Sequence, residues 1–400
     1  MKRNLLILAI TVAFAAALAG GSMAWFTDSG TAGEAKFTSG TVDIEAGMAM
    51  AYGVEQDTGN LYGIDLSSGK EYLLFDEATS DSNKYFPNAL AFDRENLRLY
   101  YAMEDGDLYF YCFESQSEVD AEGSLDDTAA GATFGKGAYW YILNGTDDLY
   151  KAKFDSDGKF EEKMKVADIS GNKYKFNLGD LAIEVKDNVL YGSTTHSQDT
   201  MFFSYCLDSE EIKEYTDEDA ALNLQLAFGA DGILYGHSTA DSEWFKVDIS
   251  DGSKTETEWS SGDKRFTDLA SNYQNNWNPG DCEYLIFHAT NTGSKNVNLR
   301  INFQGHWENG QEDDNITFEL CAAADEGKWK IEDNKIYYLE PLEKNKSVEL
   351  GAFVCFDGEQ SDDNYQGASY TLSPEFEAIQ ASNYAPYHEW GVAHYGVPQD

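Results

Sequence analysis

The middle of this sequence repeats one pattern of hydrophobic and polar positions. An aromatic residue, two alternating hydrophobic positions and an acidic or serine-containing turn recur five times. The copies span residues 62–66, 109–113, 150–154, 203–207 and 245–249, with starts 47, 41, 53 and 42 residues apart. Alternation with a period of two predicts β-strands. A strand-rich repeat of this length is typical of a β-propeller blade.

Two further strands precede each copy, and the farther one is rich in small residues that suit an inner strand beside a narrow central channel. The first copy has no inner strand before it. Residues 266–270 match residues 179–182 and fall on the same period. We therefore expect residues 266–270 to complete the first blade, which closes the ring and removes exposed sheet edges. The prediction is a five-bladed propeller, and the alternative is an unclosed stack of hairpins.

Polar residues are expected at the mouth of the propeller channel. Residues 86–88 and 178–180 carry Asn88 and Asp180 at the start of two inner strands. The pattern alone predicts no ligand for them.

Short strands also flank the repeat region, and several of them alternate between hydrophobic and polar positions. One lies before it, at residues 35–44, and the others follow at residues 284–287, 297–303, 316–320, 336–339, 348–356 and 368–379. Several short strands joined by turns predict an antiparallel sandwich. The expected fold class is therefore all-β, a β-sandwich interrupted by an inserted five-bladed propeller.

The N-terminus reads as a secretory signal. Lys2 and Arg3 precede an apolar run at residues 5–19, and residues 22–24 give a small-x-small cleavage site. An uncleaved anchor helix is the alternative, but two glycines break the run at residues 20–21, before membrane length. We expect cleavage after Ala24, a secreted protein at the cell surface or in an extracellular matrix, and no membrane attachment afterwards.

The composition excludes some classes of binding partner. The 400 residues include 71 acidic and 28 basic side chains, for a formal charge of -43. This charge repels phosphates and anionic lipid headgroups, so nucleic acid is excluded as a partner. The length predicts two or three domains.

Candidate chemistry is sparse. His388 and His394 are six residues apart, whereas the zinc-protease helix uses a spacing of four, so we predict no metal site, no cofactor and no enzyme activity. The acidic turns at residues 155–158 and 312–314 lack the pattern of a calcium loop and are expected to be solvated. Cys112 and Cys206 are expected to be free thiols. A disulfide across the sandwich can form between two of three further cysteines, with the choice left open: Cys282, Cys321 and Cys355.

Several segments resemble the TasA and camelysin family of exported matrix proteins. They are residues 20–28 and 37–44, and later residues 278–281, 290–294, 337–342, 364–368 and 377–381 in the same order. The resemblance implies a TasA-type, jelly-roll-like sandwich and filaments that grow by donated N-terminal strands. The residues it assigns to the donor strand and first sandwich strand are Trp25, Phe26, Thr27, Asp28 and Phe37. The propeller departs from the family pattern.

The resulting prediction is a secreted cell-surface or biofilm-matrix protein that polymerises with itself, head to tail, and displays a propeller. The alternative is a monomeric extracellular protein whose propeller binds a glycan, a peptide or a cation, and other matrix or cell-surface ligands are further possible partners. The expected domains are a signal peptide (1–24), a donor segment with the first sandwich strand (25–47), the propeller (48–273), the rest of the sandwich (274–385) and a tail (386–400).

Overall fold

The computed structural model is all-β, as the sequence predicts. It describes residues 42–76, 87–170, 175–176, 178–196, 199–215, 222–229, 231–259, 264–272, 277–321, 327–332, 335–361, 363–365 and 368–396. These residues form seven four-stranded sheets, all antiparallel. The predicted signal peptide and all five predicted donor residues lie outside the described residues: Trp25, Phe26, Thr27, Asp28 and Phe37.

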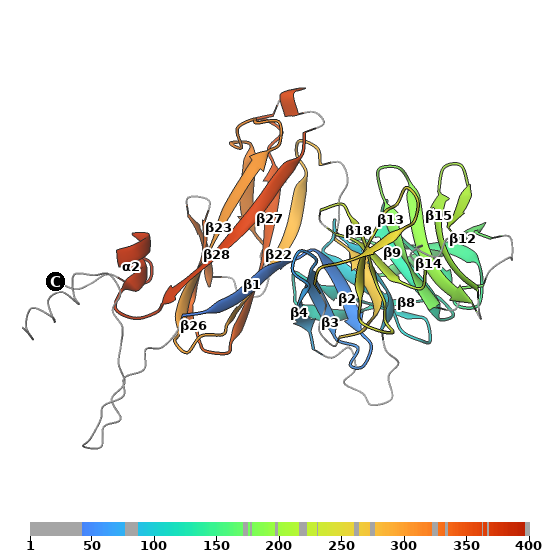
Figure 1. The fold of residues 1–400 in the computed structure, drawn as a ribbon, viewed down its shortest axis with the longest axis horizontal. Helices are drawn as coiled ribbons and strands as arrows, with labels where there is room; N and C mark the ends of the chain where they lie inside the picture. The colour runs from blue at the N-terminus through green and yellow to red at the C-terminus, as the bar shows by residue number, and fades with distance from the viewer. Residues whose placement is uncertain are drawn as a thin grey trace, which may run out of the picture.

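Five of the sheets come from the repeat region and stand side by side as blades 1 to 5 (Figure 1). Listed from the inner to the outer strand, they are β21 (Phe266–Ser271), β2 (Ala51–Glu55), β3 (Leu61–Asp65) and β4 (Lys70–Phe75); β5 (Asn88–Asp93), β6 (Arg98–Ala102), β7 (Asp107–Cys112) and β8 (Ser117–Ser124); β9 (Ala129–Gly135), β10 (Ala138–Leu143), β11 (Asp148–Phe154) and β12 (Phe160–Asp168); β13 (Leu178–Glu184), β14 (Val189–His196), β15 (Asp199–Cys206) and β16 (Ile212–Tyr215); and β17 (Gln225–Phe228), β18 (Leu234–His237), β19 (Trp244–Val247) and β20 (Lys254–Glu256).

The blades form a closed ring. Strand β21 pairs with β2, with Ala270 opposite Tyr52 and Asp268 opposite Val54. The inner strands β5, β9, β13, β17 and β21 are neighbours in that order, and β21 is also a neighbour of β5. A ring of four-stranded sheets whose first blade is completed by the last strand is a β-propeller. The predicted propeller and its closing strand are confirmed.

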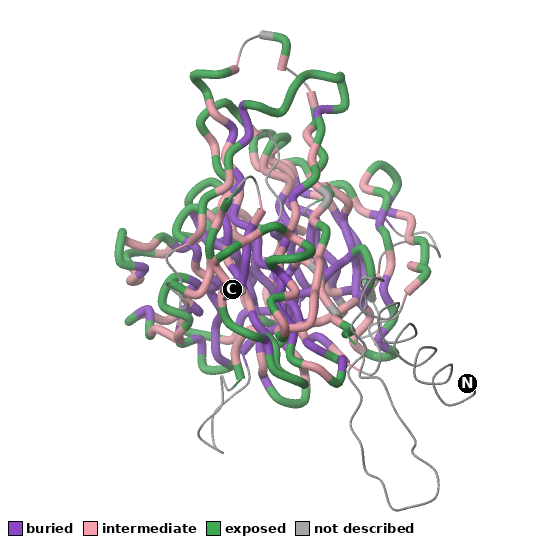
Figure 2. The backbone as a smooth tube through the Cα atoms, turned by 90° about the vertical axis from the view of Figure 1, so that its left-hand side faces the viewer, coloured by how far each residue is buried: buried purple, intermediate pink, exposed green. Residues whose placement is uncertain are grey.

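Aromatic side chains fill the space between neighbouring blades. Tyr100 of blade 2 is buried, and its ring stacks on Phe154 of blade 3 with centroids 4.1 Å apart. Tyr191 of blade 4 meets Phe228 of blade 5 at 6.0 Å. Such pairs add to the free energy gained by burying their area. The repeated aromatic positions therefore join the blades, and buried segments gather inside the molecule while projecting loops are exposed (Figure 2).

The other two sheets pack on each other as a β-sandwich. Their orders are β1-β22-β27-β24 and β25-β26-β23-β28, and both contribute to one apolar core. The strands are β1 (Ile44–Ala49), β22 (Cys282–Asn291), β23 (Val297–Trp307), β24 (Ile316–Leu320), β25 (Trp329–Glu332), β26 (Lys335–Leu342), β27 (Ser347–Phe356) and β28 (Tyr370–Gln380). The ring lies in the chain between β1 and β22, which pair with each other. A jelly-roll-like or TasA-type classification stays a prediction.

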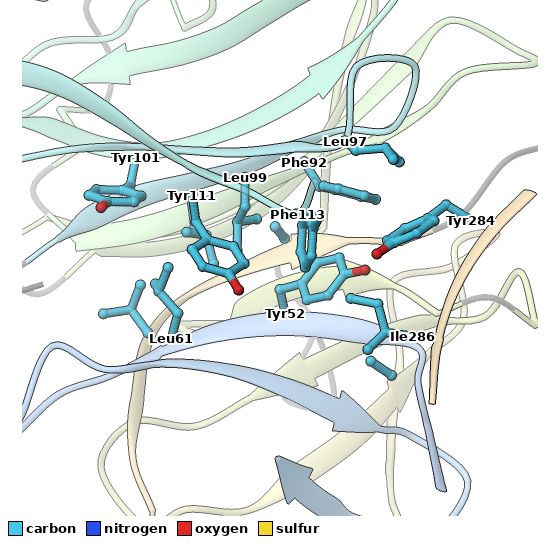
Figure 3. Close-up of a cluster of buried hydrophobic side chains, with 14 of the residues drawn as sticks. Tyr52, Leu61, Phe92, Leu97, Leu99, Tyr101, Tyr111, Phe113, Tyr284 and Ile286 are labelled. Atoms are coloured by element: carbon cyan, nitrogen blue, oxygen red, sulfur yellow. The ribbon is translucent and has the colours of Figure 1, made fainter. Parts of the chain in front are cut away.

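Strand β22 is buried on both faces. Leu285 and Phe287 point into the sandwich core, whereas Tyr284 and Ile286 pack into a core that is shared with blades 1 and 2. Figure 3 shows Tyr284 and Ile286 beside Tyr52 and the other ring residues of this core. We call the surface where β22 meets blades 1 and 2 the junction.

Polar contacts also cross the junction. Arg94, in the turn after β5, forms an ion pair with Glu283 of β22. The Tyr72 ring of β4 stacks on His288 of β22 with centroids 4.4 Å apart. Apolar and charged contacts therefore both span the junction between the ring and the sandwich.

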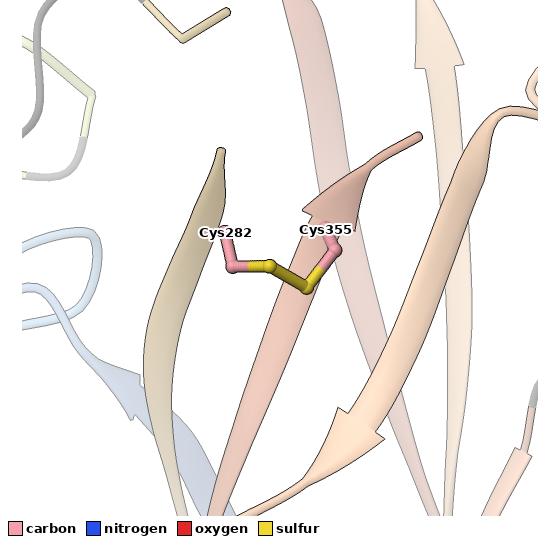
Figure 4. The surroundings of a disulfide bond; sticks show 2 residues. All are labelled: Cys282 and Cys355. Carbon is pink, nitrogen blue, oxygen red and sulfur yellow. A yellow bond between two sulfur atoms is a disulfide. The ribbon is translucent and has the colours of Figure 1, made fainter. Parts of the chain in front are cut away.

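A disulfide joins Cys282 and Cys355, which lie directly opposite each other on β22 and β27 (Figure 4). It links neighbouring strands of one sheet and does not cross between the two sheets. Cys112 and Cys206 are free thiols, as expected, and Cys321 takes no part in a disulfide.

The end of the described chain packs on the sandwich. A short helix, α2 (Ala385–Trp390), contacts β28. The Tyr395 hydroxyl donates to the carbonyl oxygens of Tyr338 (2.8 Å) and Leu299 (3.2 Å). These oxygens lie at a bulge between β23 and β26, so Tyr395 occupies a place where the ladder is interrupted. Across the described residues, no helix is long and apolar enough to cross a membrane.

Candidate functional site

Two carboxyl groups meet at the centre of the ring. Asp180 on β13 and Asp268 on β21 are both fully buried, with 2% and 0% of their surface exposed. They occupy equivalent places in the repeat, each followed by leucine and alanine. A buried carboxyl group is costly unless hydrogen bonds satisfy it. The hydrogen-bond partners of each carboxyl group therefore indicate which strands it holds.

Asp268 holds the inner strand of blade 2. Its carboxylate oxygens accept the N–H groups of Ala89 (2.8 Å) and Leu90 (3.0 Å). Strand β5 is bulged at this point, and Ala89 has a φ of 54°, which an L-residue seldom adopts. The bulge turns two successive N–H groups towards one anion, an arrangement known as a nest. The strained backbone of β5 and the carboxyl group thus fit each other.

Asp180 holds strands of two other blades. Its carboxylate accepts the N–H groups of Leu226 (2.8 Å) on β17, Leu269 (3.2 Å) on β21 and Leu181 (2.6 Å) on its own strand. Gly131 on β9 permits this approach, because a Cβ there would lie 2.6 Å from the Asp180 Cα. The expected small residues of the inner strands are thus needed at the ring centre.

The two carboxyl groups lie next to each other, because Asp180 accepts the N–H group of Leu269, the residue that follows Asp268, and the charge of Asp268 acts on Asp180. Two neighbouring carboxyl groups can hydrogen-bond to each other only when at least one of them carries a proton. Burial, and for Asp180 also the charge of its partner, raises the pKa of both groups well above the usual range, although the backbone N–H donors oppose this. The Tyr139 hydroxyl, buried next to them, donates to the Ala89 oxygen, and burial raises the pKa of this phenol.

The arrangement can hold a proton and bind backbone, but it leaves little room for a ligand. A cavity of about 10 Å³ beside Asp180 is lined by Gly131, Phe176, Ser193 and neighbouring residues. A space of this size admits roughly one water molecule. Asp180 was expected at the channel mouth, but it lies buried at the centre because the inner strands contact one another. Asn88 is half-buried and donates to the Ala129 oxygen of blade 3 (3.0 Å).

Among the described strands, β28 is the last of its sheet and pairs with β23 alone, so its other side is an open edge. Glu308 donates its N–H to the Ser369 oxygen (2.9 Å), and the register pairs residues 297–307 with 370–380. Because ladder bonds alternate along an antiparallel pair, odd-numbered residues of β28 bond to β23 and even-numbered residues turn their backbone outward. Pro374 is even-numbered, so it costs the sheet no bond, as is usual for proline on an edge strand.

The two acidic turns form local hydrogen bonds or face solvent. Asp155 accepts the N–H groups of Asp157 and Lys159, which makes the predicted solvated turn. Glu312, Asp313 and Asp314 are exposed.

Three other acidic groups lie close enough together to hold a cation, a cluster that the sequence reasoning missed: Asp147, Asp148 and Asp168. The Lys165 amine lies between two of them, 2.8 Å from Asp148 and 2.5 Å from Asp168. The ammonium group therefore offsets one of the three negative charges and occupies the space between Asp148 and Asp168.

The two histidines examined as a zinc pair have separate surroundings. His388 is exposed on α2. His394 faces the Glu332 carboxylate at 3.5 Å and packs edge-on against the Tyr337 ring. Burial lowers the pKa of His394.

The solved structures that align with this chain have low TM-scores and low sequence identity. No protein-family model matches the chain, and no curated protein matches it. A chain of the nidogen/laminin complex aligns with a TM-score of 0.40 and 10% identity, covering 56% of this chain and 98% of that one. Streptogramin B lyase aligns with a TM-score of 0.32 and 13% identity, covering 78% and 98%. Virginiamycin B lyase from Staphylococcus aureus aligns with a TM-score of 0.34 and 14% identity, covering 64% and 85%. These values carry no argument about activity.

Proposed function

We propose that this chain is an exported structural subunit of a cell surface or biofilm matrix. Each copy donates its N-terminal segment to the sandwich of the next and carries the propeller as a fixed head. The observation that supports this most is the open edge of β28. Its even-numbered residues direct their backbone groups to the outside, where an added strand can bond to them.

The side chains along this edge suit an apolar donor. Leu372 and Phe376 point towards the sandwich core but are only partly buried. A strand laid along β28 would cover them, and the resemblance to the TasA family makes Trp25 and Phe26 the aromatic residues that add apolar area. Head-to-tail donation leaves a free donor and a free edge at each end, so it yields filaments.

The junction supports the role of the propeller as a displayed head. Because Tyr284 and Ile286 are buried between ring and sandwich, the ring would keep one orientation in every subunit. A binding module on a flexible tether would not need such a shared core. The ring would therefore project at a regular spacing along the filament.

Two single substitutions on β28 test the edge. Ala378→Pro removes an N–H that points outward, so we expect a folded monomer that no longer elongates. Pro374→Ala is the matched opposite change: it adds an outward N–H and should preserve or increase elongation. The protein beginning at Trp25 would be followed by negative-stain electron microscopy and analytical ultracentrifugation, with circular dichroism to verify folding.

Deleting residues 25–32 tests the donor. The truncated chain should stay monomeric with a nearly unchanged melting temperature, and a synthetic peptide of residues 25–41 should cap growing filaments of the full mature chain. Filaments of normal yield from the truncated chain, or from a folded Ala378→Pro variant, would refute donation to β28. Monodisperse particles of the full mature chain under all salt conditions would favour the alternative of a monomeric ligand-binding propeller.

A further inference from the structure

We propose that Asp180 and Asp268 share a proton and together form a clasp that makes closure of the propeller ring dependent on pH. The inference concerns the ring itself and does not depend on filament assembly. It rests on where the two carboxyl groups lie and on which strands they hold.

The clasp holds the seam at which the ring closes. Strand β21 comes from the end of the repeat region, and only non-covalent contacts connect it to β5 of blade 2. Asp268 on β21 binds two N–H groups of β5, and Asp180 on β13 binds one N–H of β21 and one of β17. The pair therefore connects inner strands of blades 1, 2, 4 and 5 across the centre.

A proton is needed for the pair to stay together. Among the described residues, the titratable groups that face the pair are each other and the Tyr139 phenol of β10. The other inner strands face it with backbone N–H groups or with small residues such as Gly131. If both carboxyl groups ionised, two negative charges would repel each other in a buried space with room for roughly one water molecule. Loss of the shared proton should therefore separate β21 from β13 and release the nest of β5.

The sign of the pH dependence follows from linkage. The folded pair keeps a proton that the same groups lose in the unfolded chain above about pH 4. Folding therefore takes up a proton between that pH and the higher pKa of the folded pair, and stability falls as pH rises through this window. Proton uptake on folding is the quantity to measure.

Urea unfolding of the mature protein between pH 5 and pH 9 tests the clasp. Asp268→Asn and Asp180→Asn each replace one acid with a neutral group of the same shape that can donate to the remaining carboxylate. Relative to the wild type, each should lower the proton uptake derived from the pH dependence by about one proton per molecule. Asp157→Asn, in an exposed turn, is the matched control and should leave the proton uptake unchanged.

Hydrogen exchange on the unmodified protein decides the matter if neither variant folds. After correction for intrinsic rates, the amides of Ala89, Leu90, Leu226 and Leu269 should lose protection with rising pH before the amides of β3 and β7 do. Wild-type proton uptake in a folded Asp268→Asn variant would overturn the proposal. The proposal would also be overturned if, at every pH, protection at these four amides changed in parallel with protection at the amides of β3 and β7.

Discussion

Replacing Tyr284 with alanine should uncouple the ring from the sandwich. Tyr284 is 3% exposed and lies between the propeller and the sandwich. Its aromatic centroid is 5.7 Å from that of Phe113 in the propeller and 5.4 Å from that of Phe353 on β27. Truncating a buried aromatic side chain to alanine costs about 3 to 5 kcal/mol, because apolar contact is lost and a cavity remains. At this position the loss falls on the junction.

Phe287 offers a matched control on the same strand. It is 1% exposed and equally large, but it faces the sandwich core, 5.2 Å from the Phe303 ring. Phe287→Ala should lower the free energy of unfolding by a similar amount without weakening the junction. Differential scanning calorimetry separates the two effects. We expect one transition for the wild type, one transition at lower temperature for Phe287→Ala, and two resolved transitions for Tyr284→Ala.

The reasoning fails if Tyr284→Ala keeps a single transition with the same shift as Phe287→Ala. That result would mean that Tyr284 acts as an ordinary core residue and that the ring and the sandwich are coupled elsewhere. Small-angle scattering gives an independent measure, because a loosened junction should increase the radius of gyration of Tyr284→Ala but not that of Phe287→Ala.

Three further changes have defined outcomes. Burial raises the pKa of Glu349 to about 7, so ionisation of this group should lower the free energy of unfolding by roughly 3 kcal/mol as pH rises from about 4.5 to 7. In urea titrations, Glu349→Gln should make the free energy of unfolding depend less on pH. The control Glu319→Gln, on the exposed side of β24, should leave the pH dependence as it is. Cys282→Ser opens a disulfide with a sequence separation of 73 and should lower the free energy of unfolding by roughly 2 to 4 kcal/mol, with no change in dithiothreitol-treated samples. Tyr395→Phe should cost about 1 kcal/mol and increase hydrogen exchange at the C-terminal segment, and unchanged exchange would show that the hydroxyl does not anchor it.

The propeller could be predicted from the sequence because three strands of each blade carry strong signals. Buried small residues mark the inner strand, and aromatic positions mark the next two. The outer strands gave no such signal. Strand β12, for example, is mostly exposed and carries charged residues on both faces. An outer strand covers one side of a blade only, so selection for alternating hydrophobicity is weak there.

The sequence contains one indication of the junction. The continuous apolar run Tyr284–Leu285–Ile286–Phe287 differs from the alternation of a one-sided strand, and continuous runs indicate burial on both faces. The disulfide could not be predicted in this way. Choosing Cys282 and Cys355 over Cys321 requires the register of β22 on β27, which depends on contacts distant in sequence.

The carboxyl pair was half visible in the sequence. The repeat placed Asp180 and Asp268 at equivalent positions, each followed by leucine and alanine. Equivalence within a repeat does not tell which side chains meet across the ring, and nothing in the sequence marks Ala89 for a left-handed backbone. Both facts depend on how closely the inner strands approach.

Salt provides a way to separate the buried acids from the general acidity of the protein. Several contributions lower stability as pH rises from 4 to 8: repulsion among the exposed carboxylates of a chain with charge -43, ionisation of Glu71 and Glu349, whose pKa burial raises to about 7, and loss of the proton shared by Asp180 and Asp268. Screening weakens the first, because exposed charges more than about 10 Å apart interact little at 0.1 M salt. It hardly affects groups closed off from water. The part of the pH dependence that persists in high salt therefore reports the buried carboxyl groups. It should become smaller when Glu349→Gln and Asp268→Asn are combined, and adding Glu71→Gln should reduce it further.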